Sequence, residues 1–366
     1  MTYLDNGATS FHKPPQVLQA VCRAMRTCAN PGRGGYAAAM EAGRAVYRCR
    51  EEASALFDCL PEQVVFTGSC TQGLNMAIRT LVKPGGRVLI SGFEHNAVTR
   101  PLHLLGADIR VAGRKLFDPM DTLEAFEREL RAGVDAAAFT HVSNVFGYIL
   151  PVEELAKLCR KYRVPFVIDA AQSAGMLPVS LRKLGADFIA MPGHKGLLGP
   201  QGTGILLCGR IPSVFLAGGT GSESLRQEMP EYLPDRAEAG TLNVPGISGL
   251  AAGIQYIRGR GTDAILHREQ AMAQKCVQLL KNRGYRVFSG ETQSGTVSFV
   301  PKGDCEEMAN QLGELGIAVR AGLHCAPLAH ESAGTLETGT VRISFGHDAQ
   351  LGQIMALDGA FGRIKD

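Results

Sequence analysis

Short apolar segments alternate with longer amphipathic stretches between residues 63 and 208. Seven of the apolar segments have the length of buried strands, at 64–67, 87–91, 109–112, 136–140, 166–169, 188–191 and 204–208. The stretches between them can hold helices, and strands that alternate with helices indicate βαβ units. We therefore expect an α/β protein with a mostly parallel seven-stranded sheet.

Helical periodicity flanks this region on both sides. Pro14-Pro15 opens a helix that extends to about Thr27, with Val17, Val21 and Met25 on one face. A second helix places apolar residues at positions 42, 46, 49, 53 and 56, and residues 209–245 are rich in loop formers. Helices near 246–259 and 263–283 precede strands expected at 286–289, 296–300, 318–320 and 340–345. The pattern predicts a large domain over residues 1–250 and a smaller α+β domain over 251–366.

Composition excludes several classes of function. The 366 residues are 45% hydrophobic and 20% charged, with a net charge of +3, as in ordinary globular proteins. This balance, without a cluster of Lys and Arg, argues against nucleic-acid binding. No apolar run reaches 18 residues, and the N-terminus leads into a polar Asp5-Asn6-Gly7 turn. We expect no membrane span, no signal peptide and a cytoplasmic location.

The ten cysteines show no Cys-x-x-Cys spacing. This absence argues against zinc fingers and thioredoxin-like chemistry, and we expect no metal site. Most of these cysteines are expected to be small core residues, for example Cys22, Cys49 and Cys276 on helical faces.

One lysine, Lys195, lies in a glycine-rich run over 193–204, between two expected strands. Burial near other cations would lower the pKa of its amine, as a Schiff base with an aldehyde cofactor requires. A glycine-rich hairpin with an incidental lysine is the alternative. The order of residues differs from a P-loop, because the lysine precedes most of the glycines.

A continuous apolar run, Val164–Ile168, ends in Asp169. Such a run suits a central parallel strand, and its C-terminal end lies on the rim where α/β sheets bind ligands. A carboxylate there could keep the ring nitrogen of pyridoxal phosphate (PLP) protonated, and Gln172 could bind the ring oxygen. A helix cap is the alternative interpretation of Asp169.

Asp169-Ala-Ala-Gln172 followed by Gly193-His194-Lys195 resembles the class V, fold-type I PLP enzymes, most closely the cysteine desulfurase and selenocysteine lyase branch. The resemblance extends over nearly the whole chain. It implies a fold-type I PLP-dependent transferase with PLP as cofactor and Lys195 as a catalytic residue.

The resemblance also assigns the residues around the cofactor. It places Ser69, Cys70, Thr71 and His194 at the phosphate, His95 on the pyridine ring as a catalytic residue, and Asn144 near the ring oxygen and the substrate. A strand, a small-residue turn and a helix start at 65–73 suit an anion, although a simple N-cap is the alternative. Thr241, in Gly240-Thr241, would reach the phosphate of the partner subunit, which implies a homodimer with shared active sites.

The segment from Arg320 to Arg342 carries the residues expected to contact the substrate. In the similar desulfurases the cysteine of His324-Cys325-Ala326 is the catalytic nucleophile, and Arg342 grips the α-carboxylate. Nearby His324 and Arg320 could favour the thiolate. Arg320 and Arg33 are further substrate-binding candidates, and a buried structural cysteine is the alternative for Cys325. The short connection from Cys325 to Arg342 resembles the Suf-type branch.

The sequence thus indicates a cysteine desulfurase that converts L-cysteine to L-alanine and an enzyme persulfide, with a protein as sulfur acceptor. The alternatives are a selenocysteine lyase acting on L-selenocysteine, another class V aminotransferase or PLP lyase, and a non-catalytic scaffold. Three residues depart from the common pattern: Pro192 replaces Ser or Thr, Leu242 replaces Pro, and Gly7 replaces Ala.

Overall fold

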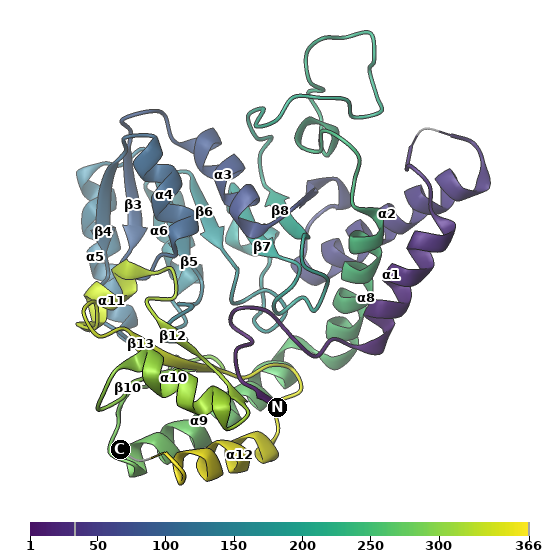
Figure 1. Cartoon of the computed structure of the whole chain (residues 1–366). Coiled ribbons are helices and arrows are strands. Elements are labelled where there is room, and N and C mark those ends of the chain that lie inside the picture. Colours follow the sequence, from purple (N-terminus) through teal and green to yellow (C-terminus); the bar gives the residue numbers. More distant parts are fainter. Residues whose placement is uncertain (33, 365–366) are drawn as a thin grey trace.

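A seven-stranded sheet forms the centre of the larger part of the molecule (Figure 1). The computed structural model describes residues 1–32 and 34–364. The strands follow the order β2-β8-β7-β6-β5-β3-β4 and are parallel except for β8, which is antiparallel to both neighbours. Their bounds are β2 Val64–Thr67, β3 Arg87–Ser91, β4 Asp108–Ala112, β5 Ala136–Thr140, β6 Phe166–Asp169, β7 Phe188–Pro192 and β8 Gly204–Cys208. The predicted α/β fold with a mostly parallel seven-stranded sheet is confirmed.

Helices cover both faces of this sheet, which explains why its central strands are apolar throughout. One face packs against α3 and α4, and the other against α2, α5, α6 and α8. The helices of this part are α1 Pro15–Thr27, α2 Ala37–Phe57, α3 Cys70–Leu81, α4 Asn96–Leu104, α5 Pro119–Ala132, α6 Val152–Lys161, α7 Leu181–Leu184 and α8 Val244–Arg260. The 3₁₀ turn Pro61–Gln63 precedes β2.

Helix α1 lies against α8 along a face that differs from the predicted one. Val17 and Ala24 are buried, whereas Met25 is 71% exposed and Cys22 is also exposed. The predictions for Met25 and Cys22 were therefore wrong. The reason is the close approach of α8, where a Cβ atom on Gly249 would lie 2.7 Å from a methyl group of Val21. Such an approach favours small residues at the contact and leaves the larger Met25 outside.

The C-terminal part has its own core and a four-stranded antiparallel sheet of order β12-β13-β10-β9. Its elements are α9 Thr262–Asn282, β9 Arg286–Phe288, β10 Thr296–Val300, α10 Cys305–Glu314, β11 Ile317–Ala318, β12 Arg320–Gly322, α11 Pro327–Ala333, β13 Thr340–Ser344 and α12 Leu351–Phe361. The strand expected at 318–320 is thus two short strands. One of them, β11, pairs with the N-terminal β1 (Thr2–Tyr3), and Leu4 joins this second core. The division into two domains at residue 250 remains a proposal, and that position lies within α8.

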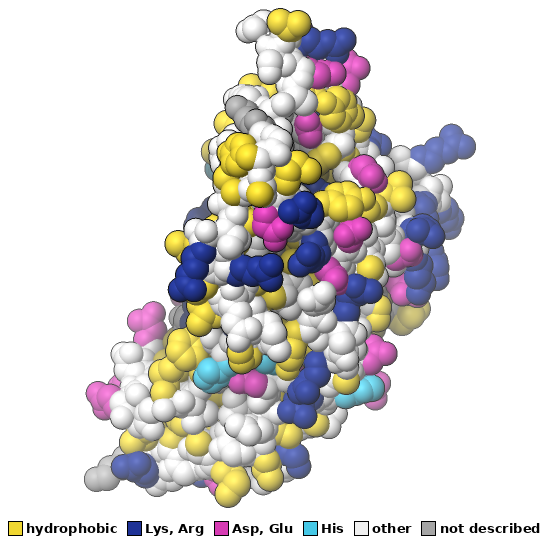
Figure 2. Space-filling view, turned by 90° about the vertical axis from the view of Figure 1, so that its right-hand side faces the viewer, with side chains coloured by type: hydrophobic (Ala, Val, Ile, Leu, Met, Phe, Trp, Pro, Cys, Tyr) yellow, Lys and Arg dark blue, Asp and Glu magenta, His cyan; other side chains and the backbone are white. Residues whose placement is uncertain are grey.

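The segment between β8 and α8 projects from the top of the molecule in Figure 1. Its one element among the described residues is the 3₁₀ turn Asp235–Ala237. Several of its large apolar side chains are exposed, among them Phe215, Leu216 and Leu225. Figure 2 shows hydrophobic side chains on the upper part of the face turned to the viewer, between charged ones. Exposed apolar groups of this kind are typical of protein–protein contacts.

Candidate active site

Lys195 lies in the turn that joins β7 to β8, beyond the end of the parallel strand β7. The backbone N–H of Gly193 donates to the carbonyl of Thr203 (2.8 Å) and closes this turn. Gly196 is required because a Cβ atom there would lie 2.3 Å from the carbonyl oxygen of Ala174. The glycines on either side of Lys195 therefore let this turn pack closely against the backbone of Thr203 and Ala174.

The amine of Lys195 has a lowered pKa. Burial is the main cause and the charge of Arg342 adds to it, while the carboxylate of Asp169 opposes the shift. A lowered pKa leaves more of the amine unprotonated near neutral pH, which is the form that attacks a carbonyl carbon.

Asp169 ends β6 and is 3% exposed. Its Oδ1 accepts hydrogen bonds from the backbone N–H of Ala171 (2.9 Å) and from the thiol of Cys70 (3.6 Å). Burial raises the pKa of Asp169, and these hydrogen bonds together with the charge of Lys195 oppose the rise. The side chain of Cys70 thus acts as a hydrogen-bond donor to Asp169. Burial holds the pKa of the Cys70 thiol well above the usual value.

The turn before α3 is built around the N-terminus of that helix. The hydroxyl of Ser69 accepts a hydrogen bond from the backbone N–H of Gln72 (3.2 Å), so Ser69 has the capping role that the sequence left open. Cys70 and Thr71 begin the helix, where backbone N–H groups have no partner within the helix. These N–H groups and the hydroxyl of Thr71 are suited to an anion.

Two histidines near Lys195 are uncharged at neutral pH. Burial, and next the charge of Lys195, lowers the pKa of His95 to about 4 and that of His194 to about 4. The Nδ1 atom of His95 accepts a hydrogen bond from the backbone N–H of Ala97 (3.0 Å), which assigns the proton to Nε2. The Nδ1 atom of His194 lies 3.0 Å from the hydroxyl of Thr9.

The N-terminal segment closes one side of the site. The side-chain amide of Gln172 donates to the carbonyl of Gly7 (3.0 Å). Asp5 lies in the same segment, and its Oδ1 is 2.6 Å from Nη2 of Arg342. This ion pair joins residues that are 337 positions apart in the sequence.

Arg342 lies in β13 and is 1% exposed. Besides Asp5, it binds the carbonyl of Asn144 through Nη1 (3.0 Å), while its Nε atom is buried and has no partner among the residues that the structure describes. The side-chain amide of Asn144 donates in turn to the carbonyl of His324 (2.8 Å). Arg320 is paired with Arg342 in the register of β12 and β13 and is exposed. Asn144 thus connects the arginine to the segment that carries Cys325.

Cys325 is exposed and lies in a turn whose backbone is fixed on both sides. His324 and Cys325 have φ values of 49° and 56°, in the left-handed region that residues other than glycine rarely adopt. The carbonyl of Cys325 accepts a hydrogen bond from the backbone N–H of Asn96 (2.7 Å), next to His95. The backbone of this turn therefore contacts Asn96, next to His95, and the side chain of Asn144.

The side chain of His324 points away from this rim. Its Nε2 atom lies 3.1 Å from the carbonyl oxygen of Thr340, and the ring stacks on that of His330. Burial lowers the pKa of His324 to about 2. His324 is therefore neutral and does not supply the positive charge for Cys325 that the sequence suggested.

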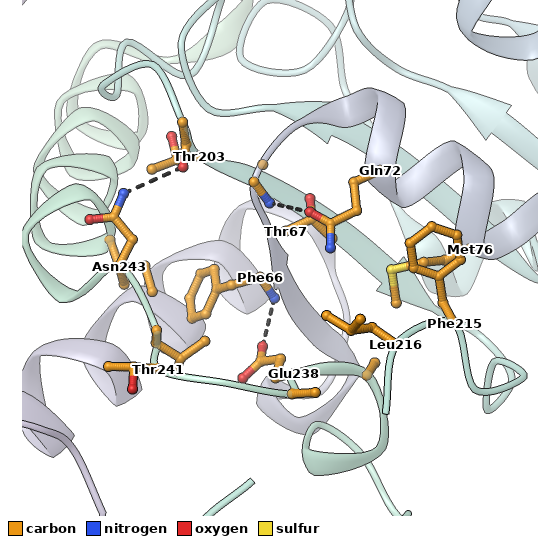
Figure 3. Close-up of a pocket in the computed structure, with 17 residues that line it drawn as sticks. Phe66, Thr67, Gln72, Met76, Thr203, Phe215, Leu216, Glu238, Thr241 and Asn243 are labelled. Carbon is orange, nitrogen blue, oxygen red and sulfur yellow. Dashed lines mark hydrogen bonds between the residues drawn. The ribbon is translucent and has the colours of Figure 1, made fainter. Parts of the chain in front are cut away.

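Thr241 is exposed at the edge of a different cavity. A space of about 200 Å³ is lined by Thr241 together with Gly68 of the turn before α3 and Gln72 in the first turn of that helix (Figure 3). Lys195 and Gln172 line a smaller space of about 30 Å³. Arg33, the remaining candidate, lies outside the described residues.

Sequence reasoning missed the partners that hold the candidate residues in place. These are Asp5, Thr9 and Asn96, which bind Arg342, His194 and the carbonyl of Cys325. The polar Asp5-Asn6-Gly7 turn and the position of Asn96 beside His95 were visible signals. Their partners were not, because they lie far away in the sequence.

Within residues 1–32 and 34–364, none of the helices combines the length and apolar composition that a bilayer crossing requires. Over the same residues, His, Cys, Asp and Glu side chains form no group of three suited to a metal ion.

Comparisons with known proteins agree with the geometry. The family model for aminotransferase class-V matches residues 2–357. A probable cysteine desulfurase of Methanothermobacter thermautotrophicus is 32% identical, over 93% of this chain and 89% of that protein. A cysteine desulfurase of Escherichia coli is 30% identical, over 89% of this chain and 84% of that protein. The solved structure of a cysteine desulfurase from Thermococcus onnurineus superposes with a TM-score of 0.91 at 31% identity, covering 99% of this chain and 94% of that one. The chain therefore belongs to the aminotransferase class-V family.

Proposed function

We propose that this protein is a PLP-dependent cysteine desulfurase, which transfers sulfur from L-cysteine to Cys325 and releases L-alanine. The observation that supports it most is that a buried amine lies close enough to a buried arginine to feel its charge, and that the arginine is connected to the turn of an exposed cysteine. Lys195 and Arg342 interact electrostatically, and Asn144 links Arg342 to the turn of Cys325. The names of the relatives support the same activity.

The residues present fit PLP in three respects. Lys195 offers an amine of lowered pKa, and Asp169 offers a buried carboxyl group at the end of β6. The first turn of α3 offers N–H groups for a phosphate, with Thr71 beside them. Pro192 offers no hydroxyl to the phosphate, unlike the Ser or Thr of the common pattern. The phosphate therefore depends more on the first turn of α3 than it would with that hydroxyl. When bound, PLP supplies an electron sink for the substrate's α-carbon.

The side chains of the protein then have distinct tasks. The guanidinium of Arg342 binds the α-carboxylate of the substrate in a planar fork, and Asn144 orients it through its carbonyl. His95 is neutral, with its proton on Nε2, and is therefore able to hold or pass a proton at that atom.

Sulfur transfer depends on the thiolate of Cys325. Its sulfur forms a bond with the sulfur of L-cysteine while the substrate's carbon–sulfur bond breaks, and the carbon takes up a proton to give L-alanine. The exposure of Cys325 leaves the resulting persulfide within reach of a protein acceptor.

The test is incubation of the purified protein with L-cysteine or L-selenocysteine and a reductant, followed by measurement of alanine, sulfide and selenide. We expect alanine and sulfide in equal amounts from L-cysteine. Turnover of L-selenocysteine alone would indicate a selenocysteine lyase. Formation of a keto acid without alanine would indicate an aminotransferase.

The protein is also proposed to act as a cytoplasmic homodimer with shared active sites. In this arrangement Thr241 of each subunit contacts the phosphate held by the other. Its exposure, and the exposed apolar side chains of the projecting segment, support this proposal. Tyr36, the N-cap residue of α2, and Tyr47, in the middle of that helix, are exposed as well and would be available for the same interface.

A further inference from the structure

A buried ion pair lies just before the segment that carries Thr241, and none of the roles above uses it. Arg50 of α2 and Glu238 are 6% and 9% exposed. Their contact is bidentate, with Nη1–Oε1 and Nη2–Oε2 distances of 3.0 and 2.5 Å. The guanidinium also lies 4.6 Å from the ring centroid of Phe66.

Both side chains bind the free edge of β2, the outermost strand of the sheet. Arg50 donates to the carbonyl of Val64, and the backbone N–H of Phe66 donates to Oε1 of Glu238 (2.6 Å). The pair therefore satisfies backbone groups that a missing neighbour strand would otherwise leave unpaired. Figure 3 shows Glu238 below Phe66, with Thr241 on the same stretch of chain.

Satisfying the edge of β2 contributes to stability, but the attraction between the two charges adds little to it. Removing two charges from water costs about as much as their attraction returns, and apolar residues of similar size can replace buried pairs without loss of stability. A charged, bidentate contact fixes the orientation of the two side chains relative to each other, which an apolar contact does not. Its position beside Thr241 therefore points to a geometric role.

The chain on the other side of Thr241 is also fixed. Oδ1 of Asn243 accepts a hydrogen bond from the backbone N–H of Gly246 (3.0 Å) and so caps α8, and Nδ2 donates to the carbonyl of Gly202 (3.4 Å). Residues 239–242 are thus a short bridge anchored at Glu238 and at Asn243. Thr241 is exposed on a bridge whose two ends are held by the large domain.

We infer that the Arg50–Glu238 pair is a positioning element that holds Thr241 in place for the cofactor phosphate. This inference rests on the proposed function, because it assumes PLP and a phosphate contact from Thr241. Glu238 acts through the backbone of residues 239–241 and does not touch the cofactor. Loss of the pair should therefore weaken binding of the phosphate and leave binding of the pyridine ring unchanged.

The experiment compares the affinities of the full-length protein, freed of cofactor, for PLP and for pyridoxal, which lacks the phosphate. For Glu238→Gln we expect PLP binding to weaken about tenfold and pyridoxal binding to stay within about twofold. Thr241→Ala should show the same selective loss, and the double variant should be no weaker than Thr241→Ala, since both changes remove one contact. Arg50→Lys, which keeps a charge but loses the fork, provides a second variant and should give a smaller loss of the same selectivity.

Asp187→Asn is the matched control. Asp187 also accepts a hydrogen bond from a strand N–H, that of Phe166 (2.8 Å), and pairs with Arg210 (2.7 Å), but it lies at the opposite end of the sheet from Lys195. The Asp187→Asn variant should have a lower melting temperature, and its affinities for PLP and for pyridoxal should be unchanged. Equal losses for PLP and pyridoxal in Glu238→Gln, or additive losses in the double variant, would overturn the inference. If Thr241→Ala leaves PLP affinity unchanged, the phosphate role of Thr241 in the proposed function fails and the inference fails with it.

Discussion

The ion pair between Asp5 and Arg342 leads to a prediction about substrate binding. Asp5 is the carboxylate that neutralises a guanidinium whose side chain is only 2% exposed. Burial lowers the pKa of Arg342, and the charge of Asp5 opposes this shift. A substrate carboxylate that binds Arg342 therefore shares the guanidinium with Asp5. Asp5→Asn removes the resident negative charge and keeps a side chain of the same shape.

The size of the effect follows from the burial of the pair. Removing one partner of a buried ion pair costs about 3–5 kcal/mol of unfolding free energy. The Oδ1 atom of Asp5 lies 2.6 Å from Nη2 of Arg342, and asparagine keeps an oxygen acceptor there. Because the side chain of Asp5 is also 19% exposed, we expect the unfolding free energy to fall by about 2 kcal/mol. For a chain of this length, that corresponds to a melting temperature about 3 °C lower. A bound carboxylate should restore most of this loss, which makes its affinity about tenfold higher than in the wild type.

The assay is thermal unfolding of wild type and Asp5→Asn over a range of L-alanine concentrations, with KM for L-cysteine measured in parallel. The variant should unfold earlier without L-alanine, gain more stability from it, and show a lower KM. Asp108→Asn, which loses an exposed pair with Arg87 and Arg110, is the control and should change neither property. Weaker L-alanine binding by Asp5→Asn would refute the reasoning and show that Asp5 orients Arg342 for the substrate.

Four further outcomes test other parts of the site. Lys195→Ala should abolish covalent attachment of the cofactor to the chain by borohydride, and an adduct at another lysine would contradict this assignment. Cys325→Ser should still bind L-cysteine but form no persulfide detectable by mass spectrometry. Its rate of alanine release should fall by about three orders of magnitude or more. Undiminished alanine release would exclude Cys325 as the nucleophile. A heterodimer of Lys195→Ala and Thr241→Ala subunits should keep about half of the wild-type activity if Thr241 acts across the interface, because one site then carries both changes and the other carries none; much lower activity would mean that Thr241 acts in its own subunit. Burial raises the pKa of Glu94 from 4.5 to about 8, so between these values the folded state keeps a proton that the unfolded chain releases, and the unfolding free energy falls as pH rises. Glu94→Gln should make this fall smaller in urea titrations at pH 5 and pH 8.5, and an unchanged fall would assign it to other buried carboxyl groups such as Asp169 and Glu269.

The strands of the large sheet were predictable because their environment is uniform. β2, β3, β5, β6 and β8 lie at the predicted residues, and β4 and β7 differ by one residue at one end. A strand covered by helices on both faces needs apolar residues at every position, so the sequence marks its full length. The periodicity of a surface helix is less informative. In α1 the apolar positions were correct in spacing, but the close approach of α8 decided which of them became buried.

Side-chain roles were predictable where the resemblance supplied them and uncertain where contacts decide them. The resemblance places Cys70 at the phosphate, and in the structure its thiol donates a hydrogen bond to Asp169. A thiol is a weak donor, and a carboxylate is a stronger acceptor than most alternatives within its reach. Neither the hydrogen bond nor the buried contact of Arg50 with Glu238 leaves a local pattern, since each pair is separated by 99 residues or more.

The protonation states of the histidines determine where positive charge is available in this site. His95, His194 and His324 are all buried enough to be neutral near pH 7, because their pKa values are lowered to about 4, about 4 and about 2. Anionic groups of a cofactor or substrate therefore meet positive charge at the arginines, and partial positive charge at the N-terminus of α3. Arg342 is already paired with Asp5, and the exposed Arg320 lies beside it in the sheet, in the strand before the turn that holds His324 and Cys325. The reactivity of Cys325 should thus depend on Arg320 and on the backbone of its turn, and not on the imidazole next to it in the sequence.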